Sequence, residues 1–305
     1  MQAMTATTWK TDPKFYTWKN YRCAYEFAPG NSPDAPPLLL VHPIGVGLSG
    51  KFWQRFCREW TTTGKPNPIY NPDLLGCGDS DMPRIAYNPA DWAEQLLHFI
   101  TNVVQKPVIL VVQGALFPVA IKLVHLPNAA NWVRGLVLSG PPPWPLMTSE
   151  RPKWRQKLIW NLFFDAPAGN GFYRYARTPK FLRNFSIRQL FANSQDVDGE
   201  WLEMLQLGAK NLASRYAVFS FLAGFWRENY QEDIARITQP TLVVMGEKAS
   251  SISREGKQET PEERLADYLK TLPKGQGIKI PKRNVLPYEA PGEFVAGVAP
   301  FVAAL

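Results

Sequence analysis

The chain has 305 residues, of which 45% are hydrophobic and 20% are charged, and its formal net charge is +8. This apolar content excludes a disordered protein, and the length suits one large α/β domain with an inserted subdomain. No apolar stretch reaches ~18 residues and residues 1–15 show no apolar leader, so we expect a soluble, cytoplasmic protein whose membrane contacts are at most peripheral.

Short apolar runs bounded by turn residues alternate with helical patterns along most of the chain. The predicted elements are a strand pair over 14–28, a strand over 36–43, a helix over 51–62, a strand over 68–73, a helix over 91–104, a strand over 107–114, a helix over 118–127, strands over 135–140, 241–246 and 277–281, and a closing helix over 291–305. Most of these strand runs are apolar without alternation, as in parallel sheets that are buried on both faces. The pattern predicts the α/β class, with a mostly parallel central sheet and helices on both faces.

The interval 141–236 breaks this alternation. It opens with PPPWP, is rich in aromatic residues, and holds helical rather than strand patterns. We predict that it is a mainly helical cap, inserted into a core that is formed by residues 1–140 and 237–305.

The positive charge is concentrated in this predicted cap. Between Arg151 and Arg188 there are nine basic residues against the single acid Asp165, an excess as large as the whole net charge. Such a field attracts anionic lipid, polyanions or acidic proteins, although a charge cluster more often forms only a solvated surface. Nothing in its pattern predicts binding to nucleic acid.

The segment 151–164 combines basic and large apolar residues. Trp154, Leu158 and Leu162 share one helical stripe. The stripe fits a helix lying on a membrane surface, with Trp at the interface and cations on the headgroups, or a lid that packs over a pocket. The lid is the preferred interpretation, and the two are compatible. The predicted membrane or partner surface consists of Arg151, Lys153, Trp154, Arg155 and Lys157.

A glycine-rich motif follows the strand over 36–43. Gly45, Gly47 and Gly50 match G-x-G-x-x-G, and Asp73 lies 23 residues after Gly50, as in the dinucleotide-binding fingerprint. Three details weaken the match: His42-Pro43 separates the strand from Gly45, a strand pair precedes the unit, and Asp73 belongs to another motif. A nucleotide-binding oxidoreductase is therefore kept only as an alternative.

Four other stretches resemble the α/β-hydrolase family. Asp73-Leu-Leu-Gly-Cys-Gly-Asp-Ser-Asp-Met-Pro83 is similar to its D-x-x-G-x-G-x-S-x-x-P loop, LVHPIG to its oxyanion-hole turn, VILVVQGALFPVA to its nucleophile elbow, and PTLVVMGEKAS to its acid-bearing strand. The resemblance spans about residues 15–305, and 169–186 look like the lid of plastid and cyanobacterial members. It implies the α/β-hydrolase fold and a relationship to enzymes of which some cleave chlorophyll-type esters.

The resemblance also places the family's Ser–acid–His triad on residues that cannot perform its chemistry. The nucleophile position is Gly114, the acid position is Ala249, and the histidine turn reads Asn284-Val285, with no histidine after His125. Removing a complete triad costs on the order of 10⁶ in kcat. We therefore predict a protein without hydrolase activity and with no catalytic residues of the usual kind.

A binding pocket can outlast the triad, because the oxyanion hole consists of backbone N–H groups. Those groups belong here to Ala115 and Ile44. The predicted pocket residues are His42, Ile44, Gln113, Gly114, Ala115 and Tyr288. The predicted partner is an apolar, carbonyl-bearing small molecule or another protein, with no metal and no cofactor.

An active enzyme of this fold is the other alternative. It would be ester hydrolase-like, a lyase or a cofactor-free oxygenase, and would use Gln113, Asn284 or Tyr288. Cys77 is a candidate nucleophile, but no histidine or lysine is predictably close, so a packed loop cysteine is preferred. Cys23, Cys57 and Cys77 form no Cys-x-x-Cys pair, which argues against structural zinc and favours a reducing compartment.

Overall fold

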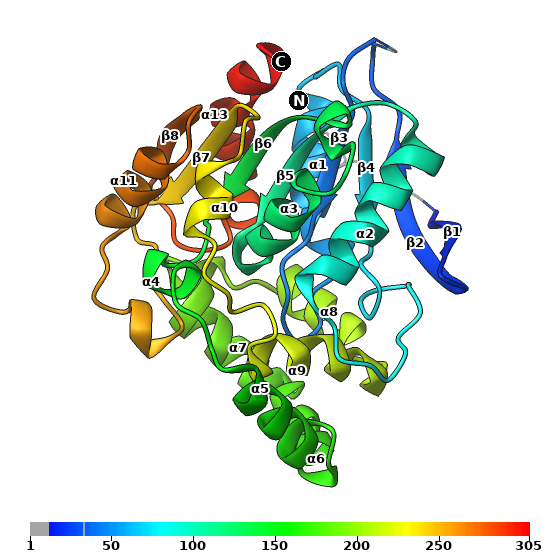
Figure 1. Cartoon of the computed structure of the whole chain (residues 1–305), viewed down its shortest axis with the longest axis vertical. Coiled ribbons are helices and arrows are strands. Elements are labelled where there is room, and N and C mark those ends of the chain that lie inside the picture. Colours follow the sequence, from blue (N-terminus) through cyan, green and yellow to red (C-terminus); the bar gives the residue numbers. More distant parts are fainter. Residues whose placement is uncertain (1–11, 33) are drawn as a thin grey trace, which may run out of the picture.

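The structure is a computed structural model that describes residues 12–32 and 34–305. It contains one sheet of eight strands in the order β1-β2-β4-β3-β5-β6-β7-β8 (Figure 1). The strands are β1 (Lys14–Trp18), β2 (Tyr21–Ala28), β3 (Leu38–Val41), β4 (Ile69–Pro72), β5 (Val108–Gln113), β6 (Val133–Ser139), β7 (Thr241–Gly246) and β8 (Gly275–Ile280). β2 pairs antiparallel with β1 and β4, and all other pairs are parallel. The predicted mostly parallel sheet is confirmed.

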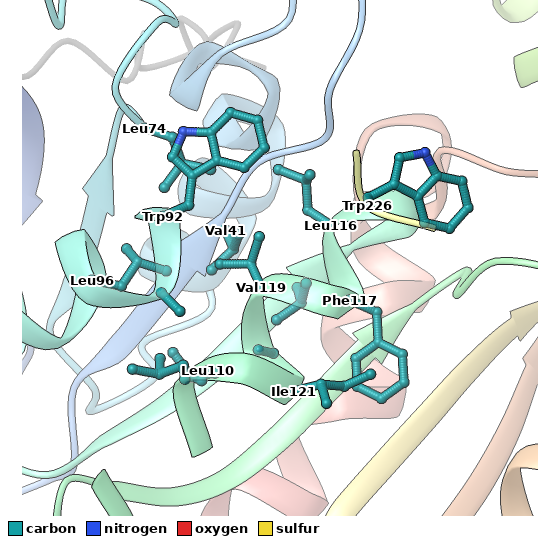
Figure 2. Close-up of a cluster of buried hydrophobic side chains, with 14 of the residues drawn as sticks. Val41, Leu74, Trp92, Leu96, Leu110, Leu116, Phe117, Val119, Ile121 and Trp226 are labelled. Atoms are coloured by element: carbon teal, nitrogen blue, oxygen red, sulfur yellow. The ribbon is translucent and has the colours of Figure 1, made fainter. Parts of the chain in front are cut away.

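Helices cover both faces of the sheet because its central strands are apolar on both sides. The core helices are α1 (Gln54–Thr62), α2 (Pro89–Phe99) with its π-helical extension η2 (Ile100–Val104), α3 (Phe117–Val124), α11 (Pro261–Thr271), α12 (Leu286–Glu289) and α13 (Pro291–Ala303). Successive strand side chains point to opposite faces. Val41 therefore packs under α2 and α3 (Figure 2), in the same cluster as Leu39, whereas Leu38 and Leu40 belong to the cluster under α1 and α13. Each buried aliphatic side chain contributes roughly 1.5–3 kcal/mol.

Helix α11 was not among the predicted elements. It begins with a capping box, in which the Thr260 side chain accepts from the Glu263 backbone and the Glu263 side chain accepts from the Thr260 backbone. Pro261 occupies its first turn, where a missing N–H costs nothing. Both signals are present in the sequence.

Residues 140–240, here called the insertion, connect β6 to β7. All of them are described, and none lies in a strand. The longer elements are α4 (Trp144–Met147), α5 (Lys153–Ile159), the π-helical η5 (Trp160–Phe164), α6 (Pro167–Ala176), α7 (Pro179–Phe185), the π-helical η6 (Ser186–Leu190), α8 (Gly199–Gly208), α9 (Arg215–Ala223) and α10 (Gln231–Ala235). In Figure 1 most of these helices gather beyond one end of the sheet, with α5 and α6 farthest from it.

Within residues 12–32 and 34–305, no helix is both long and apolar enough to cross a membrane. The expectation that residues 1–15 carry no leader falls mostly on residues 1–11, which lie outside the described residues.

Candidate functional site

A sharp turn joins β5 to α3 at Gly114. Its φ is +60°, a conformation that L-residues rarely adopt, and it opens the short helix η3 (Gly114–Leu116) that continues into α3. A strand, a positive-φ residue and a helix in succession form the nucleophile-elbow geometry. A Cβ built on Gly114 would have no neighbour closer than Gly140 O, at 3.9 Å. Steric crowding therefore does not explain the missing side chain.

The backbone N–H of Ala115 lies within the first turn of this helix. Phe117 N donates to Gly114 O, which is the first bond of the helix, so the N–H groups before it have no acceptor inside the helix. Ala115 and Ile44 both line the cavity described below, which leaves the expected oxyanion-hole groups beside the turn.

The segments that carry the acid and the histidine in the resemblance also reach this turn. Ser250, next to Ala249, donates its N–H to Asn284 Oδ1 at 3.3 Å and accepts from Asn284 Nδ2 at 3.0 Å. Gln113 Nε2 donates to Asn284 O at 2.7 Å. The segments to which the resemblance assigns the triad therefore meet in space, although Gly114, Ala249 and Val285 offer no hydroxyl, carboxylate or imidazole.

The Asn284 side chain is occupied by the backbone. Besides its two bonds to Ser250, its amide donates to Gln189 O at 2.6 Å. It holds the insertion, the loop after β7 and the turn before α12 together, although Asn284 also lines the cavity described below. The structure therefore gives no support to an enzyme that uses Asn284 for proton transfer.

A cavity of about 330 Å³ lies at the elbow, between the sheet edge and the insertion. Four predicted pocket residues line it, namely Ile44, Gln113, Gly114 and Ala115. Its apolar walls include Leu146, Leu190, Phe221, Leu222 and Trp226 from the insertion and Ile252 from the loop after β7. Trp226 packs against the α3 side of the core, near Leu116 and Phe117 (Figure 2). This volume is at the small end of the range for ligand pockets.

His42 does not line the cavity, contrary to the prediction. It is fully buried, and its Nε2 accepts from Leu74 N at 3.1 Å while Nδ1 donates to Pro43 O at 2.8 Å. Burial lowers the pKa of His42 to about 4, so the ring is neutral at pH 7. It connects the end of β3 to the loop after β4 and takes no part in proton transfer.

Tyr288 is also absent from the cavity wall, and the prediction that it shares a pocket with Gln113 is wrong. Its ring packs at 4.6 Å from the Trp201 ring and under the Arg55 guanidinium, on the α1 side of the sheet. Burial holds the pKa of its phenol well above the usual range. Gln113 and Asn284 line one cavity and Tyr288 lies apart from it, so the three side chains do not converge; an enzyme that uses one of them stays a prediction.

Cys77 is buried in the loop that follows β4, as preferred. Burial raises the pKa of its thiol well above the usual value, which keeps it protonated and unreactive.

The glycine-rich loop has no free helix N-terminus for a phosphate. Asp73 accepts from Gly50 N at 2.7 Å and from Asp79 N at 2.8 Å, so this carboxylate already satisfies the N–H that begins the helix. A Cβ on Gly47 would lie 1.9 Å from Leu205 O, because α8 crosses directly over the loop. The dinucleotide-binding interpretation is therefore wrong.

The stripe predicted to pack over the pocket faces solvent instead. Trp154, Leu158 and Leu162 are 62%, 47% and 70% exposed. A second stripe, displaced by two residues along the chain, packs inward and consists of Gln156, Trp160 and Phe164. The lid-type packing of this stripe is thus wrong. Lys153, Arg155 and Lys157 are exposed beside it, but Arg151 is half-buried and lines the cavity.

Residues 38–298 match the model of a family described as the alpha/beta hydrolase family. No curated protein matches the chain. Similar solved structures include a serine hydrolase involved in carbazole degradation (18% identity, 97% of this chain and 100% of that one, TM-score 0.73), Cfl2 from Burkholderia cenocepacia (17%, 95% and 95%, 0.74) and a malate-bound thermophilic esterase from Thermogutta terrifontis (17%, 97% and 98%, 0.70). At these identities the likeness shows the shared fold.

Proposed function

The chain belongs to the alpha/beta hydrolase family, and we propose that it is a member that binds its ligand without hydrolysing it. The observation that carries the proposal is Gly114, which keeps the positive φ of the elbow and has room for a side chain but offers none. Ala249 and Val285, at the two other triad positions, supply no base. Backbone N–H groups alone leave only ~10³–10⁴ over the uncatalysed rate.

The ligand of this proposal is apolar and bears a carbonyl group. Its carbonyl oxygen accepts from the Ala115 and Ile44 N–H groups at the elbow, and its apolar part lies against Leu146, Phe221 and Trp226. Because these three side chains come from the insertion, residues 141–236 act in this proposal as the cap of the site. A protein partner that inserts one apolar side chain is the other occupant.

The test is binding without turnover, with methyl decanoate as the probe. Calorimetric titration of the full chain is expected to give saturable binding, and chromatography of the mixture to detect no decanoic acid. Ile252→Asp is expected to weaken binding about tenfold, because it puts a charge into the apolar wall at a residue that is 54% exposed. Leu207→Asp is the matched control, since Leu207 is 63% exposed and lies outside the cavity.

Two results contradict the proposal. Release of decanoic acid at an enzymatic rate would show that hydrolysis persists. Absence of binding, or equal weakening by Ile252→Asp and Leu207→Asp, would show that the cavity is not the site.

We also propose that α5 and η5 attach the protein to an anionic lipid surface. Their exposed apolar residues are Trp154, Leu158, Ile159, Leu162 and Phe163. Three exposed cations flank them, namely Lys153, Arg155 and Lys157, and residues 151–164 contain no acid. An interfacial helix combines an apolar face with basic residues in this way, and α5 lies in the part of the insertion that is farthest from the sheet (Figure 1).

Vesicle sedimentation tests this attachment. We expect the protein to sediment with vesicles that contain phosphatidylglycerol and much less with phosphatidylcholine alone. Each cation near an anionic surface contributes about 1 kcal/mol, so Lys153→Gln/Lys157→Gln is expected to lower partitioning about 30-fold. Leu162→Ser is expected to weaken it too, whereas the control Leu207→Ser is not. Equal sedimentation with both vesicle types would argue against the proposal.

A further inference from the structure

Three arginines line the cavity at the elbow: Arg151, Arg227 and Arg264. Among the described residues that line it, none is Asp or Glu. A wall that is mostly apolar and carries cations but no acid favours an anionic group on the ligand.

The carboxylates that pair with these arginines do not line the cavity, and two of the three arginines share one of them. Glu255 pairs with Arg227 at 2.6 Å and also with Arg151, at 3.4 Å, so one carboxylate serves two guanidinium groups. Arg264 has its own partner, Glu259, at 2.6 Å. An excess positive charge therefore remains beside the cavity, carried mainly by Arg151, whose side chain is 39% exposed, and an anion bound in the cavity would balance it.

Two donors of these arginines have nothing to bind. The Arg227 and Arg264 side chains are only 4% and 3% exposed. Neither Arg227 Nε nor Arg264 Nη2 has an acceptor among the described residues. Buried N–H groups are normally paired, since an unpaired one costs about 1–3 kcal/mol. Unpaired donors on two residues of one cavity wall indicate a missing acceptor, which reaches them only after a shift of the side chains, because neither atom has accessible surface in this structure.

Arg264 and the partner of Arg227 both lie close to Pro141–143. Arg264 Nη1 donates to Pro141 O at 3.5 Å. The partner of Arg227, Glu255, precedes Gly256, which packs so closely on Pro143 that a Cβ on the glycine would be 2.5 Å from it. Pro141–143 continue directly from Gly140, whose oxygen faces Gly114. The arginines therefore lie near the elbow, within reach of a small ligand bound there.

From this arrangement we propose that the ligand is an amphipathic monocarboxylate, whose carboxylate is held by the guanidinium groups of Arg227 and Arg264 in place of the Ala115 and Ile44 N–H groups that hold a neutral carbonyl. Guanidinium presents rigid N–H pairs that match the two oxygens of a carboxylate. The apolar part lies along Leu146, Phe221 and Trp226. This inference rests on the proposed function, because it gives the chemical class of the ligand for the same cavity.

The experiment compares decanoate with methyl decanoate on the full-length protein by calorimetric titration. The two probes share a chain and differ in the charge of the headgroup. We expect decanoate to bind about 10- to 100-fold more tightly than the ester, the usual effect of a hydrogen bond to a charged group. Arg227→Met is expected to remove this preference, because it weakens the binding of decanoate much more than that of methyl decanoate. Its partner Glu255 is half exposed, so the fold tolerates the change.

Two further variants separate binding from structure. Arg264→Lys keeps a charge beside Glu259 but lacks Nη2, so it is expected to weaken decanoate selectively. Arg236→Met is the control, because Arg236 is 66% exposed, forms an ion pair with Asp233, and lies outside the cavity. It is expected to change neither affinity.

The outcomes are distinguishable. If methyl decanoate binds and decanoate binds no more tightly, the carboxylate inference is overturned while the proposed function stands. If neither probe binds, both fail. If Arg227→Met weakens both probes equally, the arginine has only a structural role and the inference is also overturned.

Discussion

The wild-type protein and the Gly114→Ser variant are both expected to show no enzymatic hydrolysis of p-nitrophenyl butyrate. The triple variant Gly114→Ser/Ala249→Asp/Val285→His is expected to hydrolyse this ester about 10³–10⁴ times faster than either of them. A complete triad is worth on the order of 10⁶ in kcat. Imperfect placement of transplanted side chains removes roughly 10² of that. A serine alone gains little, since nothing nearby removes its proton.

The geometry of the three positions makes this restoration reasonable. A Cβ at Gly114 has open space, and the positive φ costs a serine about 1–3 kcal/mol, which a well-packed turn tolerates. Val285 lines the cavity next to Gly114. Ala249 is buried beside Ser250, which is bonded to Asn284 and so lies one residue from Val285. The acid would therefore reach the imidazole, and the imidazole the hydroxyl.

The matched control is Gly114→Ala/Ala249→Asp/Val285→His, which has the acid and the base but no nucleophile. It is expected to be as inactive as the wild type, and initial-rate assays with purified proteins measure the difference. Circular dichroism and thermal unfolding show that the variants are folded. Wild-type turnover comparable to that of the restored variant would refute the proposal of non-hydrolytic binding.

The sheet and the elbow could be predicted from sequence because their signals are local. Buried parallel strands are short apolar runs in the sequence. The elbow is equally local, because β5 ends at Gln113 and the following helix begins at Gly114. The position of Tyr288 could not be predicted in this way. Tyr288 lies in α12, whereas Val285 precedes that helix and has the non-helical angles φ −116° and ψ 51°. Helical periodicity therefore does not give the direction of the Tyr288 side chain relative to that of Val285.

The orientation of α5 and η5 was equally beyond sequence patterns. The segment contains two apolar stripes, and either could be buried. The inner one is selected by α9, because Phe164 stacks on Phe219 at 4.6 Å and Trp160 packs against Tyr216. Such a choice depends on a helix about 50 residues later in the chain.

The cavity arginines have no direct sequence signature. Arg227 and Arg264 are far apart in the chain, and their charge balance depends on Glu255 and Glu259 behind the wall. For Arg264 the only available signal is indirect: the capping box at Thr260 identifies α11 as a helix and so gives Arg264 a place on it.

The buried ion pair of Glu259 and Arg264 gives the second large effect. Each of Glu259→Met and Arg264→Met is expected to lower the free energy of unfolding by about 3–5 kcal/mol, because either leaves an uncompensated charge in a site where both side chains are less than 10% exposed. The double variant is expected to lose less than either single one. Urea unfolding of the four proteins measures the coupling.

The exposed pair of Glu262 and Lys279 is the control for this cycle. Its side chains are 60% and 42% exposed, so Glu262→Met is expected to cost less than about 1 kcal/mol. Additive losses in the Glu259/Arg264 cycle would contradict the prediction, because they would mean that the two charges do not depend on each other.

The same cycle connects stability to the ligand. In Glu259→Met the guanidinium of Arg264 has lost its carboxylate partner. An anion bound in the cavity therefore restores part of the lost ion-pair stabilisation. A ligand that binds only the folded state stabilises it by RT ln(1 + [L]/Kd). Decanoate is therefore expected to raise the unfolding midpoint of Glu259→Met by more than that of the wild type, and methyl decanoate to raise both equally. Equal stabilisation by decanoate would indicate that Arg264 serves the fold alone.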